Sequence, residues 1–518
     1  TSRTEIPHII MILEDNLKLA TLLGTSEGAK DALAIASGII KEVKAERDTK
    51  NIHPQMHWDF YHSYQEKYFV TRKYEDKAQY DDRVKNGKIV NYIRFIVDLD
   101  TRFLYGRPNK VGRRYGKNSK TSNRMRDINK LIKVDNLQME AKRTASLYGE
   151  QGFRLIPVDK RTGSQVAINT KMDSNVYPHP VPLDPRDSYF LLNPYGKVVA
   201  VVIKSKFTDY VKSQEIEVTE LIVDDSRWVW HDDALQSSEL NKYTIRDEFF
   251  LQRNNDQRID TVQDMLVLQT ALNECLTDNT YFFARHGRPQ LVSSVDLSNV
   301  IGKDNMVWQV DATDDESIKV LDKLGFLVWD GKMEAAMEHL KEIEAKLFKV
   351  SSTAAISTGD LKGIGNLRSG AALITAHSPS IQKALEQQII WSENEASLAH
   401  AIASFDSLIH SEKMATRFPE FDFTIKFPTD TGVPGEELMV AEIRQLSMNS
   451  HLKTSRALIR EENPNFSDED VEAYRAELIK DSEEIVDSKR AFETETKESG
   501  SSDGSSAKKS KEQSKPKT

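Results

Sequence analysis

The chain contains two long segments with the apolar spacing of helices, separated by a segment in which short strands are predicted at 290–292 and 306–310. The first predicted helix covers residues 257–285, because the polar residues 254–256 are good helix caps and a helix-ending glycine follows at Gly287. The second starts after Asp330-Gly331 and runs to residue 356. This pattern predicts a helical hairpin whose connection contains β-structure.

The second of these helices has one narrow apolar stripe on an otherwise charged surface. The stripe consists of Met333, Met337, Leu340, Ile343, Leu347 and Val350. Such a helix is expected to pack against one partner while its other faces meet water. A glycine-bearing loop follows at 357–366, and a long helix is then predicted from Leu367 to His410. Pro379 is expected to kink this helix because it removes a backbone hydrogen bond.

The N-terminal half mixes helices and strands. A helix is predicted from Asn91 to Leu104, with apolar residues at Ile93, Ile96, Val97 and Phe103. Further helices are predicted within 1–50 and at 139–148. The predicted strands cover 153–158, 176–192, 198–203, 215–223 and 226–231.

The C-terminal part begins with a strand at 421–428, which shows a clear alternation of apolar and polar residues. Three helical segments follow at 436–446, 455–461 and 468–485, and the polar residues from Thr496 onward are expected to be a disordered tail. The fold class predicted for the whole chain is therefore α+β, predominantly α. With 518 residues, the chain is long enough for several sub-domains rather than one core.

The distribution of charged residues is uneven along the chain. The chain has 71 Lys and Arg against 80 Asp and Glu, a formal charge of −9, which argues against a protein that coats nucleic acid tightly. From Arg102 to Lys133, however, there are eleven basic residues and only one acid, Asp127. Two interpretations stay open: contact with DNA phosphates, or a solvated loop and helix face that balance acidic neighbours across subunits.

Three further features carry possible chemistry. His53, His57 and Asp59 could suggest a metal site, but Pro54 separates the two histidines and no HExxH pattern is present, which favours an aromatic packing patch. The acid cluster at 311–316 lacks the spacing of a calcium loop, which favours a solvated surface. Cys275 is the one cysteine and is expected to be a small buried residue.

No enzyme motif is present. The chain has no phosphate-binding GxxxxGK[ST] loop, no GxSxG nucleophile elbow and no CxxC pair, so we predict neither catalysis nor a cofactor or metal. It also has no apolar run long enough to cross a membrane, so no membrane partner is expected.

The order of these elements resembles the portal proteins of tailed bacteriophages, of the siphophage type. The helix, β-segment, helix and mobile loop are followed by a "GN-x-x-SG-x-AL" helix start at residues 365–373. The "YGRP" at 105–108 and the "P-x-D" at Pro182 are similar to elements of the portal wing. None of these motifs is specific by itself. The resemblance rests on their order along most of the chain.

The resemblance implies a portal fold assembled as a ring with a central channel. Its parts would be an N-terminal wing portion at 1–256, stem helices at 257–287 and 331–356, a clip at 288–330, a tunnel loop at 357–366, a C-terminal wing portion at 367–434, a crown at 435–490 and a disordered tail at 491–518.

The resemblance also implies where functional residues would lie. The tunnel loop would contact DNA through Gly359, Asp360, Leu361, Lys362, Gly363, Ile364 and Asn366. The second stem helix would line the channel with Lys341, Glu342, Lys346 and Lys349. The clip would offer Trp308, Asp311, Asp314, Asp315 and Glu316 to its partners. The basic patch would consist of Arg107, Lys110, Arg113, Arg114, Lys117 and Lys120.

The implied function is a channel at one capsid vertex through which viral double-stranded DNA is packaged, retained and ejected. The implied partners are further copies of the chain in a ring, usually a dodecamer, the terminase large subunit, head-completion or adaptor proteins, the major capsid protein and a scaffold. The protein would reside in the virion, and in the host cytoplasm during assembly. Two alternatives remain: a DNA-binding enzyme that uses the basic stretch at 102–133, and another phage structural connector.

Overall fold

The computed structural model describes residues 25–73, 75–106, 111–115, 119–166, 175–193, 195–209, 214–223, 226–240, 243–286, 290–293, 307–309, 325–327, 333–354, 377–410, 423–427, 454–463 and 469–480. The chain divides into two compact units, Thr1–Met439 and Val440–Thr518, and each is described by itself. The fold is mixed helix and sheet, which confirms the α+β class in its coarse form.

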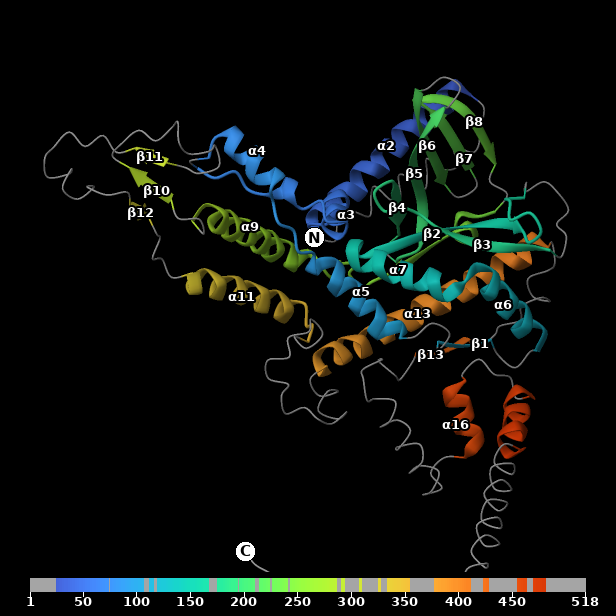
Figure 1. Cartoon of the computed structure of the whole chain (residues 1–518). Coiled ribbons are helices and arrows are strands. Elements are labelled where there is room, and N and C mark those ends of the chain that lie inside the picture. Colours follow the sequence, from blue (N-terminus) through green and yellow to red (C-terminus); the bar gives the residue numbers. More distant parts are fainter. Residues whose placement is uncertain are drawn as a thin grey trace, which may run out of the picture. The chain divides into compact units, whose positions relative to one another are not determined.

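The largest sheet is an antiparallel meander of five strands in the order β4-β5-β6-β7-β8 (Figure 1). Its strands are β4 (Ser188–Leu192), β5 (Val198–Asp209), β6 (Gln214–Val223), β7 (Ser226–His231) and β8 (Ala234–Leu240). Helix α2 (Ser26–Thr49) covers one face, where Ile39 packs near the stacked Trp228 and Trp230. Both faces of the inner strands are buried, because β5 and β6 contain consecutive apolar residues at 198–203 and 221–223.

A second, three-stranded sheet connects this meander to the helices. Its order is β3-β2-β9, with β3 (Val176–Pro182) and β9 (Phe249–Arg253) both antiparallel to β2 (Glu150–Asp159). The short helix α8 (Ile245–Glu248) precedes β9. Phe153 of β2 stacks on Phe250 of β9 with 4.9 Å between ring centroids. The helices α7 (Val134–Tyr148) and α13 (Ser378–Ile409) both contact this sheet and complete the largest core.

One glycine fixes the turn between α7 and β2. Gly149 caps α7 in the left-handed conformation, with φ +82°. A Cβ atom at this position would lie 2.1 Å from the carbonyl oxygen of Arg258, so only glycine fits there. The turn therefore brings β2 directly against the segment that leads into α9.

Two strands far apart in the sequence form a small sheet of their own. The predicted strand at 421–428 is β13 (Phe423–Lys426), and it pairs antiparallel with β1 (Gly112–Tyr115). Helix α6 (Ser119–Ile132) lies beside β1 and β3 and buries Met125 and Ile128. The sequence did not reveal β1, because its residues Gly112-Arg113-Arg114-Tyr115 lack strand-like apolar alternation.

The predicted helical hairpin is present. It consists of α9 (Gln263–His286) and α11 (Met333–Val350), which pack against each other (Figure 1). The connection carries a three-stranded sheet in the order β11-β10-β12, made of β10 (Gln290–Ser293), β11 (Val307–Gln309) and β12 (Gly325–Leu327). Strands β10 and β11 match the two predicted strands, and β12 was not predicted.

Smaller helices lie around α9. They are α3 (Pro54–Tyr61), the 3-10 helix η1 (Glu66–Tyr68), α4 (Lys77–Lys85) and α5 (Tyr92–Tyr105). Helix α5 confirms the helix predicted at 91–104: Asn91 caps it, and Ile93, Ile96, Val97 and Phe103 are buried. Part of its buried face packs with α3 and α9 into a separate core.

Two predicted helix boundaries are wrong. Helix α9 begins at Gln263 rather than 257, because Asp260, and not a residue at 254–256, accepts the free N–H groups of Val262 and Gln263. Pro379 lies in the first turn of α13 rather than in a helix interior, and a first-turn proline causes no kink because no intrahelical N–H is needed there. Residues 367–376 of the predicted long helix lie outside the described residues.

The unit Val440–Thr518 contains two described helical segments, α16 (Ser455–Glu462) and residues 469–480. Ile459 and Val471 are buried, and Arg456 forms an ion pair with Glu472. These segments agree with the predicted helices at 455–461 and 468–485 within the described range. The predicted helix at 436–446 and the tail from Thr496 lie outside it.

Candidate functional site

The α9–α11 hairpin is the element that the sequence singled out, and its contacts to the body define the candidate site. Ile343 and Leu347 of the predicted stripe are buried, whereas Met337 and Val350 are exposed. Phe348, which the stripe omitted, is buried and meets the ring of Tyr92 edge-on, with 5.0 Å between centroids. The apolar face of α11 is therefore rotated toward α5 relative to the prediction.

Helix α9 also carries a buried polar row that sequence reasoning missed. Gln269, Asn273 and Thr277 are spaced by four residues, so their side chains lie on one face of the helix. They accept hydrogen bonds from the backbone N–H groups of Tyr92 (3.1 Å), Val90 (3.0 Å) and Lys88 (2.9 Å), respectively. The row thereby holds the chain before α5 against α9. The regular spacing of these polar residues was the available signal.

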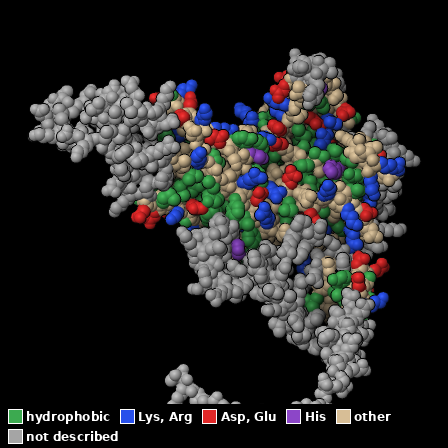
Figure 2. Space-filling model, viewed as in Figure 1, with side chains coloured by type: hydrophobic (Ala, Val, Ile, Leu, Met, Phe, Trp, Pro, Cys, Tyr) green, Lys and Arg blue, Asp and Glu red, His purple; other side chains and the backbone are tan. Residues whose placement is uncertain are grey.

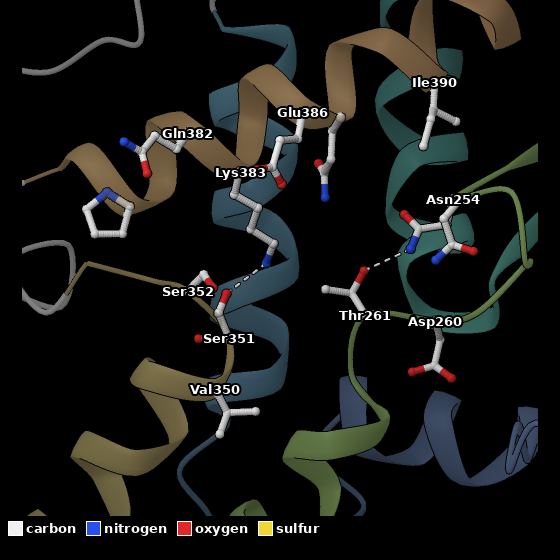
Figure 3. Close-up of a pocket in the computed structure, with 13 residues that line it drawn as sticks. Asn254, Asp260, Thr261, Val350, Ser351, Ser352, Gln382, Lys383, Glu386 and Ile390 are labelled. Carbon is white, nitrogen blue, oxygen red and sulfur yellow. Dashed lines mark hydrogen bonds between the residues drawn. The ribbon is translucent and has the colours of Figure 1, made fainter.

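The loop that leads into α9 is built by asparagine side chains. The amide of Asn254 donates to the carbonyl of Ile259 and to the hydroxyl of Thr261 (Figure 3). Its Oδ1 accepts from the buried ammonium of Lys142 at 2.9 Å. Burial lowers the pKa of Lys142 to about 7, and Trp391 lies 5.4 Å from the ammonium. This polar cluster connects α7, the loop before α9 and α13.

Asp260, which caps α9, faces the buried imidazole of His57 in α3. The distance from Asp260 Oδ2 to His57 Nε2 is 3.8 Å, and both side chains are inaccessible to solvent. Burial raises the pKa of Asp260 to about 6, although N–H groups of Gln263 and Val262 oppose the shift. Burial likewise lowers the pKa of His57 to about 4. His57 is therefore neutral near pH 7, with Nδ1 donating to the carbonyl of His53 at 2.9 Å.

A lysine from α13 holds the other end of the hairpin. Lys383 Nζ lies 2.5 Å from Asp100 Oδ2 of α5 and donates to the carbonyl of Ser351, just after α11, at 2.9 Å (Figure 3). Ser380 adds a second link, because its hydroxyl accepts from the backbone N–H of Ala354 at 3.1 Å. The first turns of α13 are thus fastened to the end of α11.

A groove of about 510 Å³ lies between these elements (Figure 3). Its lining consists mostly of amide, hydroxyl and charged side chains, and its apolar members are Val350, Pro379 and Ile390. This lining lacks the apolar character of a typical small-molecule site. In the part of the chain that the structure describes, no three His, Cys, Asp or Glu side chains gather closely enough to hold a metal ion. We therefore assign no cofactor to the groove.

The charged residues predicted on the second hairpin helix are exposed. Lys341, Glu342, Lys346 and Lys349 all meet solvent on α11. Glu342 and Lys346 form an ion pair across one turn at 2.8 Å, which lowers the pKa of Glu342. This face is therefore a mixed-charge surface in the single chain.

Several predicted site residues cannot be placed. All of the tunnel-loop residues Gly359–Asn366 and the acids Asp311–Glu316 lie outside the described residues, as do Arg107, Lys110 and Lys117. Trp308 lies in β11 and Lys120 in α6, but their side chains are outside the described set. Arg114 is exposed on β1.

Arg113 contradicts its predicted role. Its guanidinium is buried, where Nε and Nη2 donate to the two carboxylate oxygens of Glu395 at 2.9 and 2.8 Å and Nη1 donates to Asp135 at 2.5 Å. Burial would lower the pKa of Arg113, but Glu395 and then Asp135 outweigh it and raise the pKa. Arg113 joins β1 to α13 and cannot reach a DNA phosphate, so including it in the basic patch was wrong.

Arg124 of the basic stretch is also used internally. It donates to Asp406 of α13 at 2.8 Å and to the carbonyl of Val176 at 2.9 Å. Both arginines are therefore paired with acids of their own chain, which neither interpretation of the stretch predicted.

The histidine-rich segment at 53–62 is a packing patch, as the sequence favoured. Asp59 binds Lys67 at 2.5 Å and accepts from Tyr68 at 2.6 Å. Trp58 stacks on His62 with 4.1 Å between centroids. Cys275, expected to be buried, is half-buried, and burial raises the pKa of its thiol.

Two comparisons with known proteins bear on this arrangement. A family model described as phage portal protein, SPP1 Gp6-like, matches residues 45–484, which is most of the chain and includes the entire hairpin. No curated protein matches the chain significantly. Among the described residues, no helix has both the length and the apolar character needed to cross a membrane.

Proposed function

Because the chain belongs to the SPP1 Gp6-like family of phage portal proteins, we propose that it forms the ring-shaped channel through which viral double-stranded DNA is packaged, retained and ejected. The family match over residues 45–484 carries this proposal. The α9–α11 hairpin with its inserted three-stranded sheet supports it, because a stem with a clip at its tip has this construction. The family is one of structural proteins of the capsid, so the alternative of a DNA-binding enzyme loses its support.

In this proposal the hairpin is the stem, residues 288–330 are the clip, and the sheets with α13 form the wing. The two links from α13 to the end of α11 give the stem a firm base, through Lys383 and Ser380. The crown at 435–490 contains the two helical segments of the second unit. The clip is the docking surface for terminase during packaging and for head-completion or adaptor proteins afterwards. The capsid protein and a scaffold contact the ring at the vertex.

Neighbouring copies meet through the stem. Exposed apolar side chains on both stem helices support this contact: Val267 of α9 is 77% exposed and Met337 of α11 is 41% exposed. Figure 2 shows hydrophobic side chains gathered over the region where Figure 1 draws α9 and α11. An exposed apolar patch on a folded chain is typical of a surface that another protein covers. In a closed ring, the neighbouring copy of the chain covers this apolar patch, so no other protein is needed for it.

DNA passes along the mixed-charge face of α11 and the loop at 357–366. Lys341, Lys346 and Lys349 offer phosphate contacts, while Glu342 reduces the net attraction. Strong phosphate binding would slow a moving duplex, because each neutralised phosphate adds affinity. A lining of both charges therefore suits transport better than a wholly basic one.

Deletion of Asp360–Ile364 tests the role of the loop. The expected result is rings of normal appearance in negative-stain electron microscopy but a loss of packaged DNA, or of its retention, in an in vitro packaging assay. Deletion of Gly163–Ser164 in the turn after β2 serves as a control that removes loop residues elsewhere. Normal packaging and retention by the first variant would remove the loop from the proposal. Compact monomers or dimers of the wild-type chain that never enter capsids would overturn the proposal as a whole.

A further inference from the structure

The basic stretch at 102–133 places three cations along α6 and directly after its end. Arg126 and Lys130 are four residues apart on α6, so their side chains lie on the same side of the helix axis. Lys133 is the first residue after α6 and has a left-handed backbone, with φ 51°. These three residues are called the outward face of α6, although Lys133 lies one residue past its end. The opposite side of α6 holds Met125, Ile128 and Ile132 in the core. Lys130 and Lys133 are exposed and Arg126 is half-exposed, so the three cations form a positive surface at the end of α6.

These cations have no acidic partner among the residues that the structure describes. Within the described ranges, none of the three forms an ion pair, in contrast to Arg113 and Arg124. Asp127 is the acid on the same helix and makes no ion pair with Lys130 among these residues. In Figure 2, Lys and Arg side chains gather along the right-hand flank where Figure 1 draws α6. A chain with a formal charge of −9 thus presents a locally positive face.

The composition of this face favours nucleic acid over protein. The described residues of α6, β1 and β13 include no exposed large hydrophobic side chain. Protein interfaces usually have an apolar or aromatic centre, and most of their binding energy comes from it. A duplex is bound through its phosphates by surfaces that are more polar and more positive. Three cations that have neither an ion-pair partner nor an apolar anchor among the described residues match the second kind of surface.

The face lies far from the stem. Along α13, Lys383 contacts the end of α11, while Asp406 contacts Arg124 of α6. These two positions are 23 residues apart, which corresponds to roughly 35 Å of helix. The outward face of α6 is therefore separate from the mixed-charge face of the stem and from the loop at 357–366.

We propose that the outward face of α6 binds the phosphate backbone of double-stranded DNA outside the channel. The proposal depends on the proposed function only for the choice of a duplex as the ligand. Three phosphate contacts per copy give weak binding that falls steeply with salt. In an assembled ring the face recurs on every copy, so that a duplex lying across several copies is held much more tightly than by one.

A covalently closed circular duplex provides the test, because it has no end to thread through a preformed channel. Purified full-length protein, preassembled where it forms rings, is mixed with the circle over a salt series from about 50 to 200 mM. The expected affinity of the triple variant Arg126→Gln, Lys130→Gln, Lys133→Gln is at least about tenfold lower at the lowest salt. The slope of log affinity against log salt should be shallower by about 2.7 per set of three contacts.

The control variant Lys30→Gln, Lys41→Gln, Lys85→Gln removes the same charge from exposed sites elsewhere. It should bind the circle like the wild type. Equal losses in both variants would show a nonspecific charge effect and overturn the proposal, as would an unchanged triple variant. If the α6 variant bound the circle normally but failed to enter capsids, the face would belong to an acidic protein partner instead. A wild-type chain that packages DNA but does not bind the circle would overturn this inference while leaving the proposed function intact.

Discussion

At the scale of single residues, the charges that the structure buries matter more for folding than those that remain at the surface. Arg113 and Glu395 form a bidentate pair with both side chains almost completely buried. Each of these charges is stable in the interior only because the other is present. The same logic applies to Asp260, which is held beside a neutral His57 at the start of α9.

Replacing Arg113 by Met should lower the free energy of unfolding by about 3–5 kcal/mol, because Glu395 is left buried without its partner. Denaturant-induced unfolding measures the loss. Lys130→Met, on the exposed face of α6, is the control and should change stability by no more than about 0.5 kcal/mol. The double variant Arg113→Met, Glu395→Met should recover much of the loss. If the double variant were as unstable as the single one, the ion pair would not be the cause.

Replacing Asp260 by Asn should stabilise the protein at pH 7. The folded-state pKa of Asp260, about 6, lies above its ordinary value of 3.8, so the folded chain holds this proton more tightly than the unfolded chain. Ionisation of this group therefore costs stability as pH rises from about 4 to 6. Asn cannot ionise, and its oxygen still accepts from the N–H groups of Val262 and Gln263.

We expect a gain of about 1–2 kcal/mol at pH 7 that disappears below about pH 4, measured by unfolding curves across this range. The exposed Asp264→Asn in the same helical turn is the control and should show no comparable pH-dependent gain. Opposite behaviour, a loss at pH 7 that vanishes in acid, would mean that the ionised carboxylate of Asp260 stabilises the folded state.

At the scale of elements, α13 connects the parts that sequence reasoning treated separately. Its first turns bind the end of α11, its middle binds β1 through Glu395, and its last turns bind α6 through Asp406. One helix of 32 residues thus joins the end of α11 to β1 and α6. Movement of the end of α11 has to displace α13 or break these contacts.

Replacing Lys383 by Met should release the end of α11. The buried Asp100 loses its ion pair, so we expect a loss of about 3–5 kcal/mol in unfolding free energy. Hydrogen exchange of the backbone amides of Thr353 and Ala354 should also speed up, because Ser351 and α13 are no longer joined. The neighbouring exposed residue provides the control, Gln382→Met, which should leave both measurements unchanged. Unaltered exchange at Ala354 in Lys383→Met would show that Ser380 alone holds this junction.

At the scale of the whole molecule, the chain presents surfaces that a single copy does not use. The exposed apolar residues of α9 and α11 suit contact with further copies, whereas the outward face of α6 suits a phosphate backbone. Membership of the portal family makes an oligomer of the capsid the natural context for both surfaces.

Replacing Val267 by Asp should prevent ring assembly without unfolding the subunit. Val267 is exposed in the single chain, so its replacement removes no core contact, but burying a carboxylate between copies is unfavourable. We expect at least a tenfold higher concentration for assembly, equivalent to about 1.4 kcal/mol, measured by light scattering after size exclusion. Val70→Asp alters another exposed valine and should assemble normally. Normal rings from Val267→Asp would move the subunit contact away from this face of α9.

The sequence by itself determined the elements whose signal is local. The apolar spacing of α5, α9 and α11, the apolar runs of β5 and β6 and the alternation of β13 depend only on neighbouring residues, so the hairpin and most strands were predicted. The order of these elements was also enough to point to the portal family. Only the tertiary structure decided which acid each buried arginine pairs with and which side of each helix is buried. From its sequence context, Arg113 is expected to be a surface cation. In the folded chain it pairs with Glu395, which is 282 residues away in the sequence, because β1 lies near α13. The start of α9 at Gln263, by contrast, has a local signal that the prediction missed, because its cap Asp260 accepts from N–H groups only two and three residues along the chain. Contacts such as the one between Arg113 and Glu395 join distant segments, and their energies depend on burial, which no local pattern records.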